Sequence, residues 1–266
     1  MILENDLRYA IDREEFVLFY QPQININTGH VVGAEALIRW QHPQRGLLSP
    51  DLFIPAAEQS GLINQIGKWI LRKACSTMKE WSVKNNSLKR MAINLSARQF
   101  ALPNLAEQIL NILSEIELSP HYLEVEITES CLLPGFETII DTKPNPSSHF
   151  YVEETLQLLH QAGVKIAIDD FGTGYSNLSY LKRFHIDSLK IDRSFTRNIE
   201  TDPNNKTIIT MAKGLGLQLI AEGVETQEQM QFLLSHQCDL AQGYYFGKPC
   251  SKELFFLNIQ KGLNPH

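Results

Sequence analysis

The chain has 266 residues, of which 43% are hydrophobic, and it carries a formal net charge of −6. Roughly 250 residues is the usual size of one α/β barrel, so we expect a single domain over residues 1–266. The acidic balance argues against broad nonspecific nucleic-acid binding, which depends on a basic surface.

The sequence shows no sign of a membrane or export segment. No apolar run approaches the ~20 residues that a membrane helix needs, and the first residues are acidic where a secretory signal would be basic. The four cysteines have no metal-binding spacing and fit buried thiols in a reducing compartment. These features predict a cytoplasmic domain.

Strand-like runs alternate with helix-like segments along the whole chain. Eight such runs occur, in chain order VLFYQPQ, VVGAEALIRW, RMAINLS, YLEVEIT, VKIAIDD, DSLKID, LQLIAEGV and DLAQGYYFG. Eight strands in a β-α rhythm predict a closed barrel with helices outside it.

The helices are predicted from apolar spacing and from capping residues. Apolar residues recur at steps of three and four between Ile63 and Trp81, which predicts one face of a long helix. Asp202 and Pro203 supply an N-cap and a first-position proline for a later helix. Thr226 and Gln229 form a capping box directly after the strand that contains Glu222.

One connection breaks the rhythm. Residues 131–150, CLLPGFETIIDTKPNPSSHF, contain three prolines and two adjacent serines, which indicates a loop with at most one helical turn. It is longer than the usual connection of about two to six residues. Because it follows the strand of Glu126, we expect it to cover part of the substrate channel or to contribute to a subunit contact; an inert, solvated surface loop is the alternative.

Carboxylates stand at the ends of several predicted strands, and one rim of a parallel barrel would collect them. They are Glu35, Glu126, Asp169, Asp170 and Glu222. Lys190 is the one obvious cation for five negative charges, and like charges in contact cannot all stay ionised unaided. Oxygen ligands without His or Cys favour the hard ions Mg²⁺ or Mn²⁺. Two such ions about 3.5 to 4 Å apart form a recurring clamp for phosphodiester hydrolysis.

Three further motifs extend this site. On one strand face, Leu37 and Arg39 follow Glu35, with Arg39 about 13 Å along, so the guanidinium could reach a second phosphate; a solvent-paired Glu and Arg is the alternative. In KIAIDDFGTG, glycines allow the backbone to turn so that both aspartates are exposed; otherwise the motif is an acidic turn. Lys190 in an apolar run requires carboxylate partners, in a site or in a structural salt bridge.

The aromatic run QGYYFGKP is the last motif. Phe246 and Pro249 could provide an apolar slot for a base, and the alternative is a core segment or a surface loop. Gln242 opens this run.

Taken in order, EALIRW, MAINLS, EITES, DDFGTGYSNL, LKIDRSF, AEGVET and QGYYFGKP resemble the EAL-domain cyclic di-GMP phosphodiesterases. The resemblance extends from Leu7 to Phe256. It implies a TIM-like (β/α)8 barrel with one antiparallel strand, which hydrolyses cyclic di-GMP to linear pGpG with two Mg²⁺ or Mn²⁺ ions. It also implies a homodimer and, in longer members, attached sensory or cyclase domains.

The resemblance assigns roles to individual residues. Metal ligands fall on Glu35, Asn94, Glu126, Asp169 and Asp170. The groups around the attacking water are Lys190, Glu222 and Gln242. Substrate contacts or their supports fall on Gln21, Leu37, Arg39, Asp192, Glu225 and Pro249. Glu129 matches the residue that anchors the loop from Phe171 to Leu178.

Two rival functions are considered. The first is a catalytically silent receptor for cyclic di-GMP or a partner-binding module, which would require an uncoupled metal site despite intact ligands. The second is a different metal-dependent barrel enzyme, such as a phosphatase.

Overall fold

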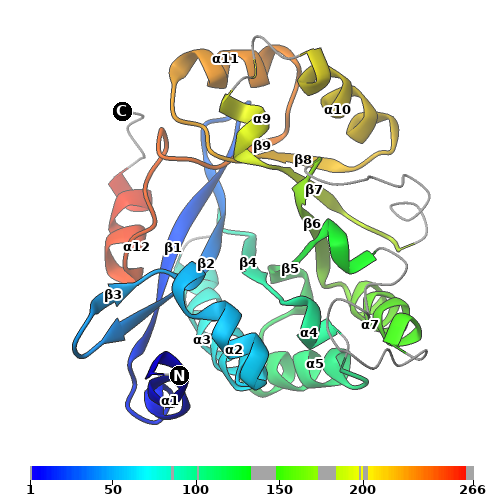
Figure 1. Ribbon diagram of the computed structural model, residues 1–266. Coiled ribbons are helices and arrows are strands. Elements are labelled where there is room, and N and C mark those ends of the chain that lie inside the picture. The colour runs from blue at the N-terminus through cyan, green and yellow to red at the C-terminus, as the bar shows by residue number, and fades with distance from the viewer. Residues whose placement is uncertain are drawn as a thin grey trace.

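The computed structural model describes residues 2–84, 87–100, 102–132, 148–172, 184–197, 199 and 203–261. One mixed sheet closes on itself into an eight-stranded barrel with helices outside it, as the sequence predicts (Figure 1). The barrel strands are β1 (Phe16–Asn25), β2 (Val31–His42), β4 (Arg90–Asn94), β5 (Leu123–Thr128), β6 (Lys165–Phe171), β7 (Ser188–Ile191), β8 (Gln218–Ala221) and β9 (Leu240–Ala241).

Strand β1 is the reversed strand of the barrel. It pairs antiparallel with β2 on one side and with β9 on the other, whereas β2, β4, β5, β6, β7, β8 and β9 follow one another in parallel. The cause is local: β1 and β2 are joined by a tight turn at 26–30, and such a turn joins only antiparallel strands. The predicted single antiparallel strand is confirmed.

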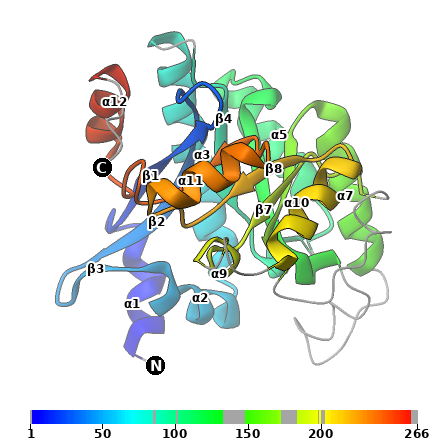
Figure 2. The same ribbon diagram turned by 90° about the horizontal axis from the view of Figure 1, so that it is seen from above.

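Helices surround the strands on the outside. In chain order they are α1 (Ile2–Ala10), α2 (Ile54–Ser60), α3 (Ile63–Lys84), α4 (Ala97–Phe100), α5 (Leu105–Ile116), α7 (Ser148–Ala162), α9 (Arg193–Arg197), α10 (Pro203–Gly214), α11 (Gln227–Ser235) and α12 (Lys252–Lys261). Viewed from above, α3, α5, α7 and α10 lie around the strands (Figure 2). The apolar face predicted for α3 is buried, from Ile63 to Trp81.

The capping predictions can be compared with the helix starts. The capping box before α11 is present, with the Thr226 side chain accepting from the Gln229 backbone and the Gln229 side chain accepting from the Thr226 backbone. Helix α10 begins at Pro203, as expected, while its predicted cap, Asp202, lies outside the described residues.

Three boundaries differ from the predictions. The last strand is only two residues long, because Gly243 packs against backbone: a Cβ there would lie 2.1 Å from the Val224 oxygen, so the chain turns instead of extending. The short strand β3 (Gly46–Leu48), paired with the end of β2, carries no sequence signal. Helix α7 begins at Ser148, so the predicted loop ends earlier than residue 150.

Most of the predicted loop at 131–150 cannot be compared. Cys131 belongs to a single 3-10 turn, Glu129–Leu132, and residues 133–147 lie outside the described part of the chain. In the described residues, no helix combines the length and the hydropathy that a bilayer crossing requires.

Candidate metal centre and substrate cavity

A single buried lysine lies at the centre of the site. Lys190, from β7, is 1% exposed, and its Nζ lies 2.7 Å from Glu126 Oε2 and 2.7 Å from Glu222 Oε1. Asp169 Oδ1 lies 3.2 Å and Glu35 Oε2 3.7 Å from the same nitrogen. Four carboxylates, on or directly after the four strands β2, β5, β6 and β8, therefore share one ammonium group, as a barrel with its polar residues at one rim predicts.

A chain of amide groups holds Glu35 in place. Asn94 donates from Nδ2 to Glu35 Oε1 at 2.7 Å, and Gln242 donates from Nε2 to Glu35 Oε2 at 2.5 Å. The same Gln242 nitrogen lies 3.0 Å from Gln21 Oε1, and Gln21 donates to the Gly247 carbonyl. The side-chain amides of Asn94 and Gln242 thus both use their nitrogen on Glu35. Their oxygens, Asn94 Oδ1 and Gln242 Oε1, remain as hydrogen-bond acceptors.

The paired aspartates reach the same site because the backbone turns after β6. Successive strand residues normally point to opposite faces. Here Asp170 has φ +53° and Gly172 has φ +95°, and the pairing register with β7 shifts at this point. As a result, ligand oxygens of Asp169, Asp170 and Glu222 all lie within 4.8 Å of one another. The predicted turn is confirmed at Gly172, while Gly174 lies outside the described residues.

The charges of this cluster do not balance. Burial and repulsion by Glu35 raise the pKa of Glu126 well above its usual range, against the attraction of Lys190. Burial likewise raises the pKa of Glu222 to about 8. Burial also acts to raise the pKa of Glu35, but Lys190 and the amide donors outweigh it and lower that pKa. Burial opposes the charge of Lys190, yet its carboxylate partners raise its pKa well above the usual value.

The imbalance indicates a missing positive charge. One ammonium cannot neutralise four carboxylates, and the raised pKa values of Glu126 and Glu222 reflect this surplus of negative charge. Glu126 is fully buried, and its Oε1 has no hydrogen-bond partner among the described residues. An all-oxygen set of this kind, with an orphaned carboxylate oxygen, fits Mg²⁺ or Mn²⁺.

An open cavity of about 550 Å³ lies above this cluster. Its lining includes nine of the predicted site residues: Gln21, Glu35, Leu37, Asp169, Asp170, Asp192, Glu222, Glu225 and Gln242. Lys190 and Glu126 lie beneath it, in contact with the lining carboxylates. Asp192 also accepts a hydrogen bond from the Ser194 backbone, which holds the start of α9.

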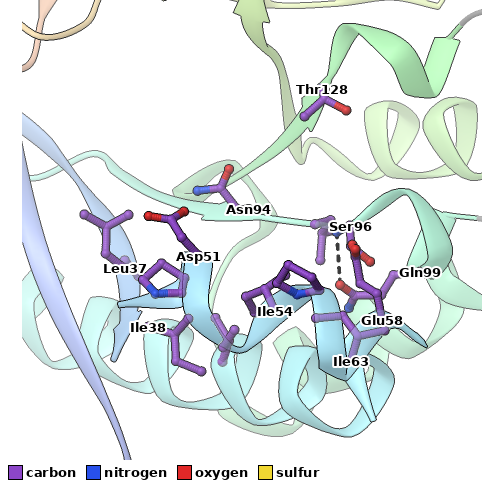
Figure 3. A pocket seen from close by; sticks show the side chains of 15 residues that line it. Leu37, Ile38, Asp51, Ile54, Glu58, Ile63, Asn94, Ser96, Gln99 and Thr128 are labelled. Atoms are coloured by element: carbon purple, nitrogen blue, oxygen red, sulfur yellow. Dashed lines mark hydrogen bonds between the residues drawn. The ribbon is translucent and has the colours of Figure 1, made fainter. Parts of the chain in front are cut away.

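A second, mainly apolar cavity of about 400 Å³ adjoins the first (Figure 3). Leu37 and Asp51 line both cavities. Ile54 and Ile63 contribute apolar walls, and Asn94, which donates to Glu35, belongs to the same lining.

Six predicted site residues are absent from the lining of the 550 Å³ cavity. Lys190 and Glu126 lie beneath it, Asn94 lines the second cavity, and Arg39, Glu129 and Pro249 line neither. Arg39 donates to the Ile38 carbonyl at 2.8 Å and lies 5.7 Å from the Phe19 ring centre. Burial lowers the pKa of Arg39, and the nearby Tyr244 and Asp51 oppose this shift. The guanidinium is therefore at the rim, and its contact with a second phosphate remains a prediction.

Glu129 is buried, and neither of its carboxylate oxygens has a hydrogen-bond partner among the described residues. Its predicted target, the loop from Phe171 to Leu178, is described only at Phe171 and Gly172. The anchoring role remains a prediction.

Phe246 is 6% exposed and packs in the core, which agrees with the alternative reading of this run as a core segment. Tyr244, two residues earlier, is 54% exposed and lines the 550 Å³ cavity. Asp51 and Arg193 also line the cavity and were missed. Arg193 directly follows Asp192, a signal that was available, whereas Asp51 lies in the 3-10 turn Pro50–Leu52, away from any barrel strand.

The fold and the rim define a barrel with an acidic, metal-compatible centre, and comparison with known proteins identifies the class. The EAL domain profile matches residues 4–249. MucR of Pseudomonas aeruginosa, a bifunctional diguanylate cyclase and cyclic di-GMP phosphodiesterase, is 40% identical over 261 residues, which are 97% of this chain and 36% of MucR. The cyclic di-GMP phosphodiesterase NbdA of the same organism is 38% identical over 251 residues, 93% of this chain and 30% of NbdA.

A solved structure agrees with the sequence comparisons. The phosphodiesterase part of MucR, solved as a complex with cyclic di-GMP, superposes with a TM-score of 0.86 at 39% identity, covering 96% of this chain and 100% of that one. The chain belongs to the EAL domain family. It spans about a third of the length of the curated relatives named above.

Proposed function

We propose that this domain hydrolyses cyclic di-GMP to linear pGpG with two bound Mg²⁺ or Mn²⁺ ions. The observation that carries the proposal is the convergence of Glu35, Glu126, Asp169 and Glu222 on the single cation Lys190. A surplus of carboxylate at the open end of a barrel is the arrangement that divalent ions complete. The bound cyclic di-GMP in the MucR structure supports the choice of substrate.

The ions would be held by Glu35, Asn94, Glu126, Asp169 and Asp170. When bound, they would neutralise the scissile phosphate and make the attacking water more acidic. Asn94 fits this role because its Nδ2 is used on Glu35, which directs its oxygen away from that contact.

The remaining polar groups would act on the water. Glu222 lines the cavity and would accept a proton from the water once bound ions lower its pKa, which is raised to about 8 in the metal-free protein. Lys190 holds Glu222 and Asp169 at fixed positions through its contacts of 2.7 and 3.2 Å. Gln242 Oε1, buried and without a partner among the described residues, would orient the water as an acceptor.

The two adjoining cavities would hold the rest of the substrate. The apolar cavity beside Asn94 suits a flat nucleobase, and the carboxylates of Asp51 and Glu58 in its lining could accept from the amino and imino groups of guanine. The first cavity would hold the sugar-phosphate ring over the ions. Arg39, at the rim, would meet the second phosphate.

Two broader expectations stay proposals. MucR and NbdA are about three times as long as the matched region, so sensory or cyclase domains attached to this one would supply its regulation. A homodimer is also proposed.

The product of the reaction tests the proposal. Cyclic di-GMP incubated with the protein and Mg²⁺ or Mn²⁺ should yield pGpG, and EDTA should stop the reaction. Tight binding of cyclic di-GMP without any turnover would instead favour a silent receptor. Hydrolysis of simple phosphate monoesters in place of cyclic di-GMP would favour a phosphatase.

A further inference from the structure

Arg193 is the one lysine or arginine that lines the 550 Å³ cavity within the described part of the chain. Seven carboxylates line the same cavity. Lys190 lies below the lining with four carboxylates within 3.7 Å, so its charge is already shared. A phosphate that enters this cavity therefore has Arg193 as its cationic protein partner.

The position of Arg193 is set by close backbone packing. It follows Asp192 and is the first residue of α9, whose start is held by the contact of 2.9 Å between Asp192 Oδ1 and the Ser194 nitrogen. The turn after Glu222 packs on its stem: a Cβ at Gly223 would lie 2.5 Å from the Arg193 Cβ. Gly223 also has φ +65°, which favours glycine. The stem of Arg193 thus lies against the strand end that carries Glu222.

The electrostatics agree with this position. Burial and the neighbouring carboxylates Asp169 and Asp192 raise the pKa of Asp170, while Lys190 and Arg193 oppose that increase. Arg193 is therefore within electrostatic reach of Asp170, whose ligand oxygen lies within 4.8 Å of those of Asp169 and Glu222. The phosphate nearest to it would be the scissile one.

We propose that Arg193 binds the non-bridging oxygens of the scissile phosphate and retains the terminal phosphate that hydrolysis creates; this inference rests on the proposed function. In the reaction, a bond forms between the water oxygen and phosphorus, and the bond from phosphorus to the 3′ oxygen breaks. One proton of the water passes to Glu222 and from there, directly or through solvent, to the departing 3′ oxygen. The second proton of the water stays on the new terminal phosphate or ionises to solvent. At neutral pH the terminal phosphate then carries nearly one more negative charge than the diester. A guanidinium pairs with two phosphate oxygens at once and favours this added charge.

Arg193 and Arg39 would then have separate roles. Arg39 lies on β2, beside Phe19, and would contact the phosphate that does not react. Arg193 would act where charge increases during the reaction. Loss of Arg193 should lower kcat, whereas loss of Arg39 should mainly raise KM.

The test compares two inhibitors that differ only in the terminal phosphate, pGpG and GpG, in the Mg²⁺-loaded protein. The ratio of their inhibition constants measures how strongly the site binds that phosphate. In the wild type pGpG should bind more tightly. Arg193→Ala should reduce the preference by about tenfold, the size of one charge-assisted contact. Arg193→Lys should retain part of the preference for pGpG, because lysine keeps the positive charge but lacks the paired N–H donors of a guanidinium.

Arg197→Ala is the matched control. Arg197 is exposed, lies one turn later in α9 and does not line the cavity, so its loss removes the same charge without touching the phosphate. It should leave the preference unchanged. An equal preference in Arg193→Ala and the wild type would overturn the role of Arg193, as would an equal loss in both arginine variants. A wild type that neither hydrolyses cyclic di-GMP nor binds pGpG would overturn the proposed function and this inference with it.

Discussion

At the scale of single residues, the site depends on how few positive charges the protein supplies to its own carboxylates. Lys190 is 1% exposed and contacts four of them. Removing a member of such a buried cluster leaves its partners uncompensated, and adding a divalent ion relieves their repulsion. The clearest consequences therefore concern metal binding and protonation.

Asp169→Asn should abolish metal-dependent hydrolysis and leave the fold intact. The change removes one charged ligand beside Lys190 without altering the side-chain volume. Turnover of cyclic di-GMP and the thermal unfolding curve should be measured on the same preparation. Near-normal turnover would rule out the two-ion arrangement proposed above.

The metal-free protein should lose stability as the pH rises, through Glu222. Its pKa is about 8 in the folded protein, against an ordinary value of 4.5. Between these values the folded state keeps a proton that the unfolded chain releases. The contribution of Glu222 to the free energy of unfolding is therefore fully present below about pH 4.5 and is lost as the pH rises through about 8. Thermal melting in EDTA between about pH 5 and pH 9 should show a smaller decline in Glu222→Gln than in the wild type.

Magnesium supplies the control for that measurement. Metal binding selects the deprotonated carboxylates, so saturating Mg²⁺ should reduce the difference between the two proteins at high pH. An identical pH dependence of the wild type and Glu222→Gln in EDTA would mean that Glu222 does not hold a proton in the metal-free site.

Arg39→Ala should raise KM for cyclic di-GMP more than it lowers kcat. The guanidinium lies at the rim, outside the lining of the cavity above the metal centre, so it would bind substrate and transition state alike. Steady-state kinetics at saturating Mg²⁺ separates the two constants. A collapse of kcat at unchanged KM would assign Arg39 to the chemical step instead.

At the scale of elements, helix α3 supports the strand end that carries Asn94 from outside the barrel. Gln99 of α4 is 4% exposed, and its Oε1 accepts from the Ser96 backbone at 3.1 Å, two residues after Asn94. Gly67 of α3 makes room for it, since a Cβ at that position would lie 1.9 Å from Gln99 Nε2. The strand end that carries Asn94 is thus held through a glycine on a neighbouring helix.

Gly67→Ala should therefore lower stability, by about 1 to 3 kcal/mol as for other overpacked cores, and weaken Mg²⁺ binding. The added methyl group displaces Gln99 and releases the Ser96 backbone. Gly214→Ala is the matched control: Gly214 ends α10, and a Cβ there meets nothing within 4 Å. Chemical denaturation and Mg²⁺ titration should distinguish the two variants; equal behaviour would contradict the role given to Gly67.

The same elements show what the sequence could and could not predict. All eight barrel strands were found because each contains an apolar, strand-like run, including VLFYQPQ for β1. The antiparallel direction of one strand was implied only by the family resemblance. The length of β9 was overestimated. It depends on the close contact of Gly243 with the backbone of Val224, and the sequence alone does not indicate that these two segments lie side by side. The carboxylates and amides at strand ends were found because a parallel barrel brings strand ends together. Asp51 was missed because its turn reaches the rim only through the packing of α2.

At the scale of the whole molecule, the reversed strand β1 contributes to the acidic site. Because β1 and β2 form a hairpin, Gln21 lies opposite Glu35 in the pairing register, and its Oε1 accepts from the Gln242 amide that also donates to Glu35. Residues 133–147, which follow the strand of Glu126, lie outside the described part of the chain, and their predicted effect on substrate access or dimerisation stands as a prediction.

The most direct test of the account is a single-turnover reaction, with protein in excess over cyclic di-GMP, in ¹⁸O-labelled water and Mn²⁺. The two-ion proposal has water attack phosphorus, so the product should be pGpG with one heavy oxygen in its terminal phosphate, and EDTA should prevent its formation. Cyclic di-GMP that stays bound and intact would contradict the account, and so would pGpG that carries no label or that forms equally well in EDTA.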